Sequence, residues 1–202
     1  LKLLADVGII GLPNAGKSLL LSKISAQHPD VGNYKFTTLN PMPGVVEIND
    51  WETYTAVEIP GLIQGAHKGK GLGNKFLRHI DRTSILVHLL DCSERPAEKT
   101  LEKYRTIRTE LRKYSNEVNK KEEIVLGNKI DKISEDQIED IKNIFEKNGL
   151  EIDFISAKTG RNIERIKKKI YKILQNSVKK EEAGEEKKHK TYRFSGEEGY
   201  KV

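Results

Sequence analysis

The chain has 202 residues, of which 36 are Lys or Arg and 30 are Asp or Glu, giving a formal charge of +6. This length suits one α/β domain with an appendage. No apolar run approaches the roughly 20 residues needed to cross a bilayer, so we expect no transmembrane segment. The single cysteine, Cys92, excludes an internal disulfide framework and fits a cytoplasmic protein. The mildly basic charge permits an RNA or ribosomal surface as partner.

The first predicted element is a short apolar strand over residues 5–10, which leads into a glycine-rich loop at residues 11–18 (GLPNAGKS). This loop has the spacing G-x-x-x-x-G-K-[ST] between a strand and a helix, which predicts a phosphate-binding P-loop. Glycines let the loop curl around a triphosphate, and the following helix aims free N–H groups at the same oxygens. Lys17 would reach the β- and γ-phosphates, and the Ser18 hydroxyl would bind Mg²⁺. The nucleotide-binding residues predicted here are Asn14, Ala15, Gly16, Lys17, Ser18 and Leu19.

Two long loops flank a predicted hairpin, whose strands cover residues 44–48 and 53–59. The first loop begins at Gln27, and the second begins at Pro60 and is rich in glycine. Loops of this length inside a compact domain are usually functional. A plain connector remains the alternative for the second loop, but two such loops beside one phosphate site favour a conformational switch.

The remaining predicted elements are a helix over residues 74–81, a strand over 85–90, a helix over 96–113, a strand over 123–127, a helix from Ser134 to about Gly149, a strand over 152–155 and a helix over 162–175. His88 lies in a continuous apolar strand and is predicted to be a core residue. The helix over 96–113 carries one apolar stripe. Its Lys and Arg residues are interpreted as a solvent-exposed face, with a ribosomal RNA contact as the alternative: Lys99, Lys103, Arg105, Arg108 and Arg112.

Alternating strands and helices predict an α/β fold, namely the P-loop NTPase three-layer sandwich with a mostly parallel six-stranded sheet and helices on both faces. In such sheets the ligand binds at the carboxyl ends of the strands. We assign residues 1–178 to this domain, 179–190 to a charged linker and 191–202 to the truncated start of a C-terminal domain. The absence of an initial Met suggests a fragment of a longer protein.

The stretch N-K-x-D at Asn128, Lys129 and Asp131 predicts the identity of the base. A carboxylate at Asp131 can accept hydrogen bonds from guanine N1–H and from the 2-amino group, whereas adenine offers neither donor. Asn128 would bond the base edge and tie its loop to the P-loop, and the Lys129 stem can lie along the base. Backbone N–H groups of a later segment are predicted to bind guanine O6: Ser156, Ala157 and Lys158.

On these motifs the chain resembles the Obg family of P-loop GTPases between about residues 3 and 175. The segments that carry the resemblance most specifically are residues 11–18, 36–41, 59–67, 69–73 and 76–83. The resemblance implies GTP binding, slow GTP hydrolysis to GDP and phosphate, and a role in large ribosomal subunit assembly or stress control, in a protein that we expect to be a monomer.

The resemblance also implies roles for residues of the two switch loops. Thr38 would bind Mg²⁺ and the γ-phosphate, the Gly61 N–H would bind the γ-phosphate, and Phe36 and Thr37 would join the nucleotide site. Together with Lys17, Thr38 and Gly61 form the predicted catalytic set.

Several positions depart from the family pattern. Glu58 stands where the family has an aspartate, and it would hold Mg²⁺ through a water with altered affinity. Leu19 replaces a threonine, and Lys35 replaces a proline in the first switch. Leu62 occupies the position where many GTPases place a water-orienting glutamine, so we expect slow intrinsic hydrolysis. We hypothesise that K⁺, held in part by Asn14, substitutes for an arginine finger.

Two other functions remain open at this point. One is a non-hydrolysing guanine-nucleotide-binding scaffold that docks ribosomal RNA, which Leu62 and Glu58 favour. The other is a metabolic P-loop ATPase or kinase, which Asp131 argues against. Phosphate release and nucleotide competition separate them.

Overall fold

The structure, a computed structural model, describes residues 4–26, 43–59, 80–114, 118 and 120–177. In chain order its elements are β1 (Ala5–Ile10), α1 (Lys17–Ile24), β2 (Pro43–Glu47), β3 (Thr53–Glu58), β4 (Thr83–Asp91), α3 (Glu98–Tyr114), β5 (Glu123–Asn128), the short 3₁₀ helix η2 (Ile130–Lys132), α5 (Glu135–Lys147), β6 (Asp153–Phe154) and a C-terminal helix over residues 163–177. The predicted loops after Gln27 and Pro60, most of the predicted helix over 74–81, and the predicted linker and C-terminal segment over 179–202 lie outside the described residues.

The six strands form one sheet in the order β2-β3-β1-β4-β5-β6. Only β2 is antiparallel to its neighbour, while β3, β1, β4, β5 and β6 run parallel. The predicted α/β fold, with a mostly parallel six-stranded sheet, is therefore confirmed. The predicted hairpin is the β2–β3 pair, and the Asn49 side chain closes its turn by accepting hydrogen bonds from the N–H groups of Trp51 and Glu52.

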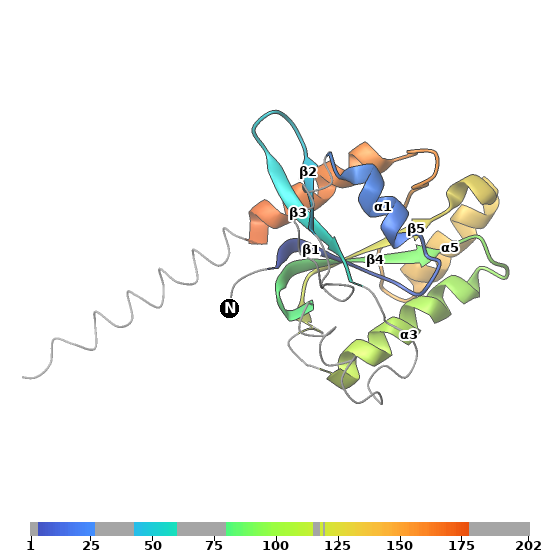
Figure 1. Ribbon diagram of the computed structural model, residues 1–202. Coiled ribbons are helices and arrows are strands. Elements are labelled where there is room, and N and C mark those ends of the chain that lie inside the picture. Colours follow the sequence, from blue (N-terminus) through green and yellow to red (C-terminus); the bar gives the residue numbers. More distant parts are fainter. Residues whose placement is uncertain (1–3, 27–42, 60–79, 115–117, 119, 178–202) are drawn as a thin grey trace, which may run out of the picture.

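Helices cover both faces of the sheet (Figure 1). On one face α1 and the C-terminal helix pack on the strands through residues such as Leu20 and Ile166. On the other face lie α3 and α5, which contribute Ile107 and Phe145 to two further clusters. Consecutive residues of β4 point to opposite faces and are buried on both, which explains its continuous apolar sequence. In the described part of the chain, no helix has both the length and the apolar character that crossing a membrane requires.

Several predicted boundaries are wrong by one or two residues, and two of them have a clear local reason. β6 has two residues rather than four, because Asn162 donates its side-chain N–H to the carbonyl of Phe154 and the chain then turns away. The helix predicted from Pro96 begins at Glu98, since residues 96–99 first form a turn in which Lys99 N–H bonds the Pro96 carbonyl. The predicted start of α5 at Ser134 is confirmed: Ser134 is its N-cap, and the Ser134 hydroxyl accepts the N–H of Gln137 at 3.3 Å.

The interpretation of α3 as a helix with an exposed basic face is wrong for two residues. Lys99, Arg105 and Arg112 are exposed as predicted, but the side chains of Lys103 and Arg108 are only 17% and 14% exposed. Lys103 Nζ donates to the Asp91 carbonyl at 3.0 Å and to Glu94 at 2.9 Å. These two cations therefore hold α3 to the sheet instead of facing solvent.

A buried polar cluster between α3 and the sheet surrounds the Glu123 carboxylate. His88 Nδ1 lies 2.9 Å from Glu123 Oε1, and the Tyr104 hydroxyl donates to Oε2 at 3.3 Å. Arg108 lies 3.5 Å from the same oxygen. Burial acts to raise the pKa of Glu123, but the hydrogen bond and charge of His88, the charge of Arg108 and the Tyr104 hydroxyl outweigh it, so that pKa is lowered. His88 is fully buried, as predicted for a core histidine.

We expect Glu123→Gln to lower the free energy of unfolding by about 2 kcal/mol at pH 7, because the amide cannot accept all the bonds that the carboxylate accepts. The pKa of Glu123 is lower in the folded protein than its ordinary value of 4.5 in the unfolded chain. The ionised carboxylate therefore stabilises the fold at pH values above 4.5, and this stabilisation is lost as the pH falls through the folded pKa. The difference between variant and parent should therefore shrink in acid.

Urea unfolding at pH 7 and at pH 3 measures both effects. Glu122→Gln is the matched control, since Glu122 is the exposed neighbour and should change the free energy by less than about 0.5 kcal/mol. Equal losses for the two variants at pH 7 would contradict the role given to Glu123.

Candidate functional site

The predicted site residues that the structure describes gather at the carboxyl edge of the sheet. The P-loop follows β1, Glu58 ends β3, Asn128 ends β5 and Ser156 follows β6. Because the parallel strands all end at this edge, segments far apart in sequence meet there. The predicted location of the site is therefore consistent with the fold.

The P-loop has the backbone that its glycines predict. Gly16 has φ 98° and Asn14 has φ 64°, both in the left-handed region. A Cβ at Gly16 would lie 2.5 Å from Asn128 Nδ2, so the residue is confined by its neighbour as well as by its dihedral angles. The curl is followed directly by α1, whose first turn would offer free backbone N–H groups to a bound phosphate.

Lys17 lies inside the loop. It is only 8% exposed, and its Nζ donates to the carbonyls of Gly11 at 3.1 Å and Leu12 at 3.3 Å. Burial lowers the pKa of Lys17, and the nearby charge of Glu58 opposes this shift. A bound phosphate would favour the charged ammonium further. The arrangement holds a cation where the β- and γ-phosphates are expected.

Ser18 and Glu58 meet beside Lys17. The Ser18 hydroxyl donates to Glu58 Oε2 at 2.5 Å, and Glu58 Oε1 lies 3.8 Å from Lys17 Nζ. Glu58 is one methylene longer than the aspartate that the resemblance leads us to expect, and it still reaches the hydroxyl of Ser18, the predicted Mg²⁺ ligand. A hydroxyl and a carboxylate oxygen at one point are the hard ligands that Mg²⁺ prefers, so these residues fit that ion.

Asn128 connects the predicted base loop to both of its neighbours. Its Nδ2 donates to the Ala15 carbonyl at 2.8 Å, and its Oδ1 accepts the N–H of Ala157 at 3.0 Å. The predicted tie between base loop and P-loop is therefore present. Ala157 N–H, which we expected at guanine O6, is bonded to Asn128 here. Each amide atom of Asn128 has capacity for one more hydrogen bond.

Asp131 and Ser156 also lie together, as the predicted guanine site requires. The Ser156 hydroxyl donates to Asp131 Oδ1 at 2.5 Å, while Asp131 itself is exposed. The same hydroxyl accepts the N–H of Thr159 at 3.1 Å, which fixes the turn that carries Lys158. The Ser156 hydroxyl therefore holds Asp131 Oδ1, and this contact also fixes the orientation of the other carboxylate oxygen, Oδ2.

Asp91 is a functional candidate that the sequence motifs do not predict. Asp91, the last residue of β4, pairs with Lys129: Nζ lies 2.6 Å from Asp91 Oδ2. A signal was present, since Asp91 is a polar residue at the carboxyl end of a buried strand, as Asn128 is. Lys129 has φ 70°, so its side chain leaves a strained backbone and is held by this ion pair.

The remaining predicted site residues are Leu19 and four residues of the two switch loops. Leu19 is 43% exposed and lies on α1 next to Ser18. Four residues fall outside the described part of the chain, so their roles stay predictions: Phe36, Thr37, Thr38 and Gly61.

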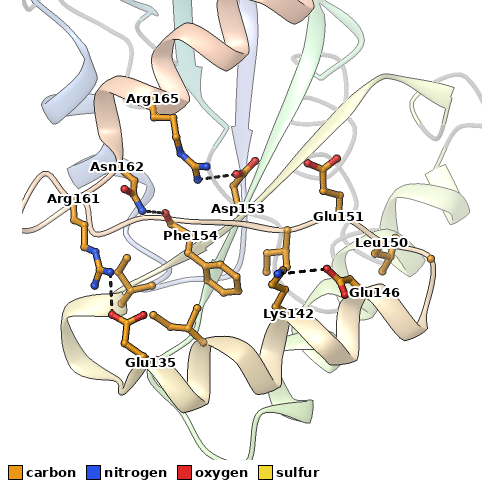
Figure 2. Close-up of a pocket in the computed structure, with 14 residues that line it drawn as sticks. Glu135, Lys142, Glu146, Leu150, Glu151, Asp153, Phe154, Arg161, Asn162 and Arg165 are labelled. Carbon is orange, nitrogen blue, oxygen red and sulfur yellow. Dashed lines mark hydrogen bonds and ion pairs between the residues drawn. The ribbon is translucent and has the colours of Figure 1, made fainter.

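The structure has one cavity beside the P-loop and a larger one away from it. One, of about 270 Å³, lies beside the P-loop and is lined by Pro13, Asn14, Asp91, Glu94 and Lys103 among others. A larger one, of about 680 Å³, lies between α5, β6 and the start of the C-terminal helix (Figure 2). No predicted site residue lines the larger cavity, and Figure 2 shows charged side chains at its rim already paired with one another, as Arg161 is with Glu135.

The sheet order and this phosphate- and base-binding edge define a P-loop nucleotide-binding domain. Solved structures with the same fold include the G domain of the T. maritima FeoB iron transporter, at 20% identity and TM-score 0.57 over 81% of this chain and 94% of that one. A variant of Aquifex aeolicus Era bound to GDP and AlF4⁻ has 25% identity and TM-score 0.58 over 85% of this chain and 57% of that one. Residues 6–129 match the sequence model of the 50S ribosome-binding GTPase family, and the chain belongs to this family.

The resemblance to Obg proteins is confirmed by curated relatives. GTPase Obg of Persephonella marina is 44% identical over 90% of this chain and 54% of that protein. GTPase Obg of Aquifex aeolicus is 43% identical over 91% of this chain and 54% of that protein. The chain therefore spans about half the length of these relatives.

Proposed function

We propose that this chain binds GTP and GDP and hydrolyses GTP slowly, as a molecular switch. The observation that carries the proposal is the double anchorage of Asn128, which joins the P-loop at Ala15 to the predicted guanine loop at Ala157. The predicted phosphate site and the predicted guanine site thereby adjoin each other at the carboxyl edge of the sheet. Asp131, next to Ser156, supplies the carboxylate that selects guanine over adenine.

Lys17 and the backbone N–H groups of the P-loop would bind and neutralise the phosphates. Ser18 would hold Mg²⁺ directly and Glu58 through a water, with Thr38 as the further ligand that the resemblance implies. When bound, Mg²⁺ supplies additional positive charge at the β- and γ-phosphates. Gly61 N–H would bind the γ-phosphate. With Leu62 at the position of the water-orienting glutamine, this chain has a weak means of orienting water, so we expect slow hydrolysis.

The description of the family whose model matches residues 6–129, 50S ribosome-binding GTPase, supports the large ribosomal subunit or its RNA as the partner of the switch. A role in subunit assembly or stress control would follow from that partner. We place this function in the cytoplasm and expect a monomer.

The proposal is tested by phosphate release from GTP and from ATP with this chain. We expect turnover of GTP and none of ATP above background, because adenine leaves Asp131 without donors. Tight GTP binding without release of phosphate would instead support the non-hydrolysing scaffold. Equal turnover of both nucleotides would support the metabolic ATPase.

The monovalent cation provides a separate prediction. We expect GTP turnover to rise severalfold when K⁺ replaces Na⁺ at constant ionic strength, because Asn14, exposed at the P-loop beside the small cavity, would supply an oxygen to the larger ion. Asn14→Ala should lose the difference between the salts and still bind GDP. Equal turnover in K⁺ and Na⁺ would refute a K⁺ site.

A further inference from the structure

The end of β4 and the residues that follow it, 91–94, are held by hydrogen bonds from several elements. This segment contains no residue of the predicted nucleotide motifs. In the sheet, Asp91 pairs with Asn128, and the N–H of Cys92 donates to the Asn128 carbonyl at 3.1 Å. Lys103 of α3 donates to the Asp91 carbonyl, and Gln137 of α5 donates to the Cys92 carbonyl at 3.2 Å. The backbone of Asp91 is thus fixed relative to the base loop before any ligand binds.

The side chain of Asp91 is fixed as well. Its Oδ1 accepts two hydrogen bonds from Ser93, from the N–H at 2.9 Å and from the hydroxyl at 2.6 Å. That leaves Oδ2 directed at Lys129 Nζ, 2.6 Å away. The side chains of Asp91 and Lys129 are 16% and 24% exposed, so the pair is shielded from solvent more than a surface ion pair. Burial acts to raise the pKa of Asp91, but Lys129 and Ser93 hold it below its usual range.

We propose that Asp91, oriented by Ser93, is a positioning residue that sets guanine-nucleotide affinity by holding Lys129 in place at the base site. This inference rests on the proposed function, in which the Lys129 stem lies along the base. A free lysine side chain must lose rotamer freedom to adopt that position, and an ion pair already formed removes part of this cost from binding. Asp91 need not touch the nucleotide to have this effect.

A double-mutant cycle on GDP affinity tests the proposal, with the dissociation constant measured by titration calorimetry. Lys129→Met removes the ammonium and keeps an unbranched stem in which a sulfur replaces one methylene, and Asp91→Asn removes the charge that holds the ammonium. We expect each single variant to bind GDP about tenfold more weakly than the parent. Because both changes break the same contact, the double variant should bind no more weakly than the weaker single variant, instead of about 100-fold more weakly than the parent.

Two further variants sharpen the test. Ser93→Ala removes the hydroxyl bond to Asp91 Oδ1 and keeps the bond from the Ser93 N–H, so it should weaken GDP binding by a smaller factor than Asp91→Asn. Glu94→Gln, which removes the neighbouring carboxylate that pairs with Lys103, is the control and should change the GDP affinity by less than about twofold. Unfolding of the nucleotide-free variants separates a loss of stability from a loss of affinity, since a purely structural ion pair would change only the former.

The outcomes are distinct. Additive losses, or GDP affinity of Asp91→Asn equal to the parent's, would overturn the proposal while leaving the proposed function intact. Parental affinity in Lys129→Met would also overturn it. A parent chain that binds no guanine nucleotide would overturn the proposed function itself, and with it the role of Asp91.

Discussion

Replacing Lys17 by alanine is expected to lower the affinity for GDP by at least about 100-fold, because it removes the one side-chain cation inside the loop. Charge-assisted hydrogen bonds to phosphate contribute about 1.5–3 kcal/mol each, and Lys17 can donate to two phosphate oxygens. The carbonyls of Gly11 and Leu12, which now accept its Nζ, would point into the emptied space and repel the phosphates. Titration of the variant with GDP measures the loss.

The control for this experiment is Lys23→Ala. Lys23 lies on the same helix, α1, and is exposed in its last turn, so its loss changes the net charge equally without touching the loop. Thermal unfolding of both variants shows whether the fold survives. Micromolar GDP affinity retained in a folded Lys17→Ala variant would count against the P-loop assignment.

Asp131→Asn should reduce the preference for guanine over adenine by about 100-fold. The carboxylate can accept from both guanine donors, whereas the amide accepts from one and turns its own N–H₂ towards the other. A donor that faces another donor in the bound complex forms no hydrogen bond and is costly. The variant should bind xanthine nucleotides better than the parent does, since xanthine has a carbonyl where guanine has the 2-amino group.

Competition of GTP, ATP and XTP for the same site gives the three affinities. Asp140→Asn, on the exposed side of α5, is the matched control and should leave them unchanged. In the Asp131→Asn variant the Ser156 hydroxyl can still donate to the oxygen of the new side-chain amide, so a collapse of this loop is not expected. Unchanged discrimination between GTP and ATP would refute the role of Asp131.

Much of the fold could be predicted because local patterns and tertiary packing agree. β4 and β5 are buried on both faces and have continuous apolar sequences, and α3 buries one stripe that includes Ile107 and Leu111. The cap at Ser134 depends only on residues within one helical turn. Such signals need no knowledge of distant segments.

The remainder depends on partners that no local pattern indicates. Lys103 and Arg108 have the spacing of an exposed face, yet the Asp91 carbonyl at the end of β4 draws Lys103 inward and the Glu123 carboxylate at the start of β5 draws Arg108 inward. The pairing of Asp91 with Lys129 joins residues 38 positions apart, and it could be found only once β4 and β5 were seen side by side. The motif residues Asn128 and Ser18 were predictable because their chemistry is tied to the ligand and not to the neighbours.

The two bonds of the Asn128 side chain also set an order of events during synthesis. They connect positions 113 and 29 residues apart, so the P-loop and its supports leave a ribosome at very different times. Chains emerge from the N-terminus first. A nascent chain that already displays Lys17 but stops short of Ala157 has a phosphate loop without its second anchor. If the chain binds a nucleotide as proposed, we therefore expect the growing polypeptide to retain it stably only after translation has passed Ala157.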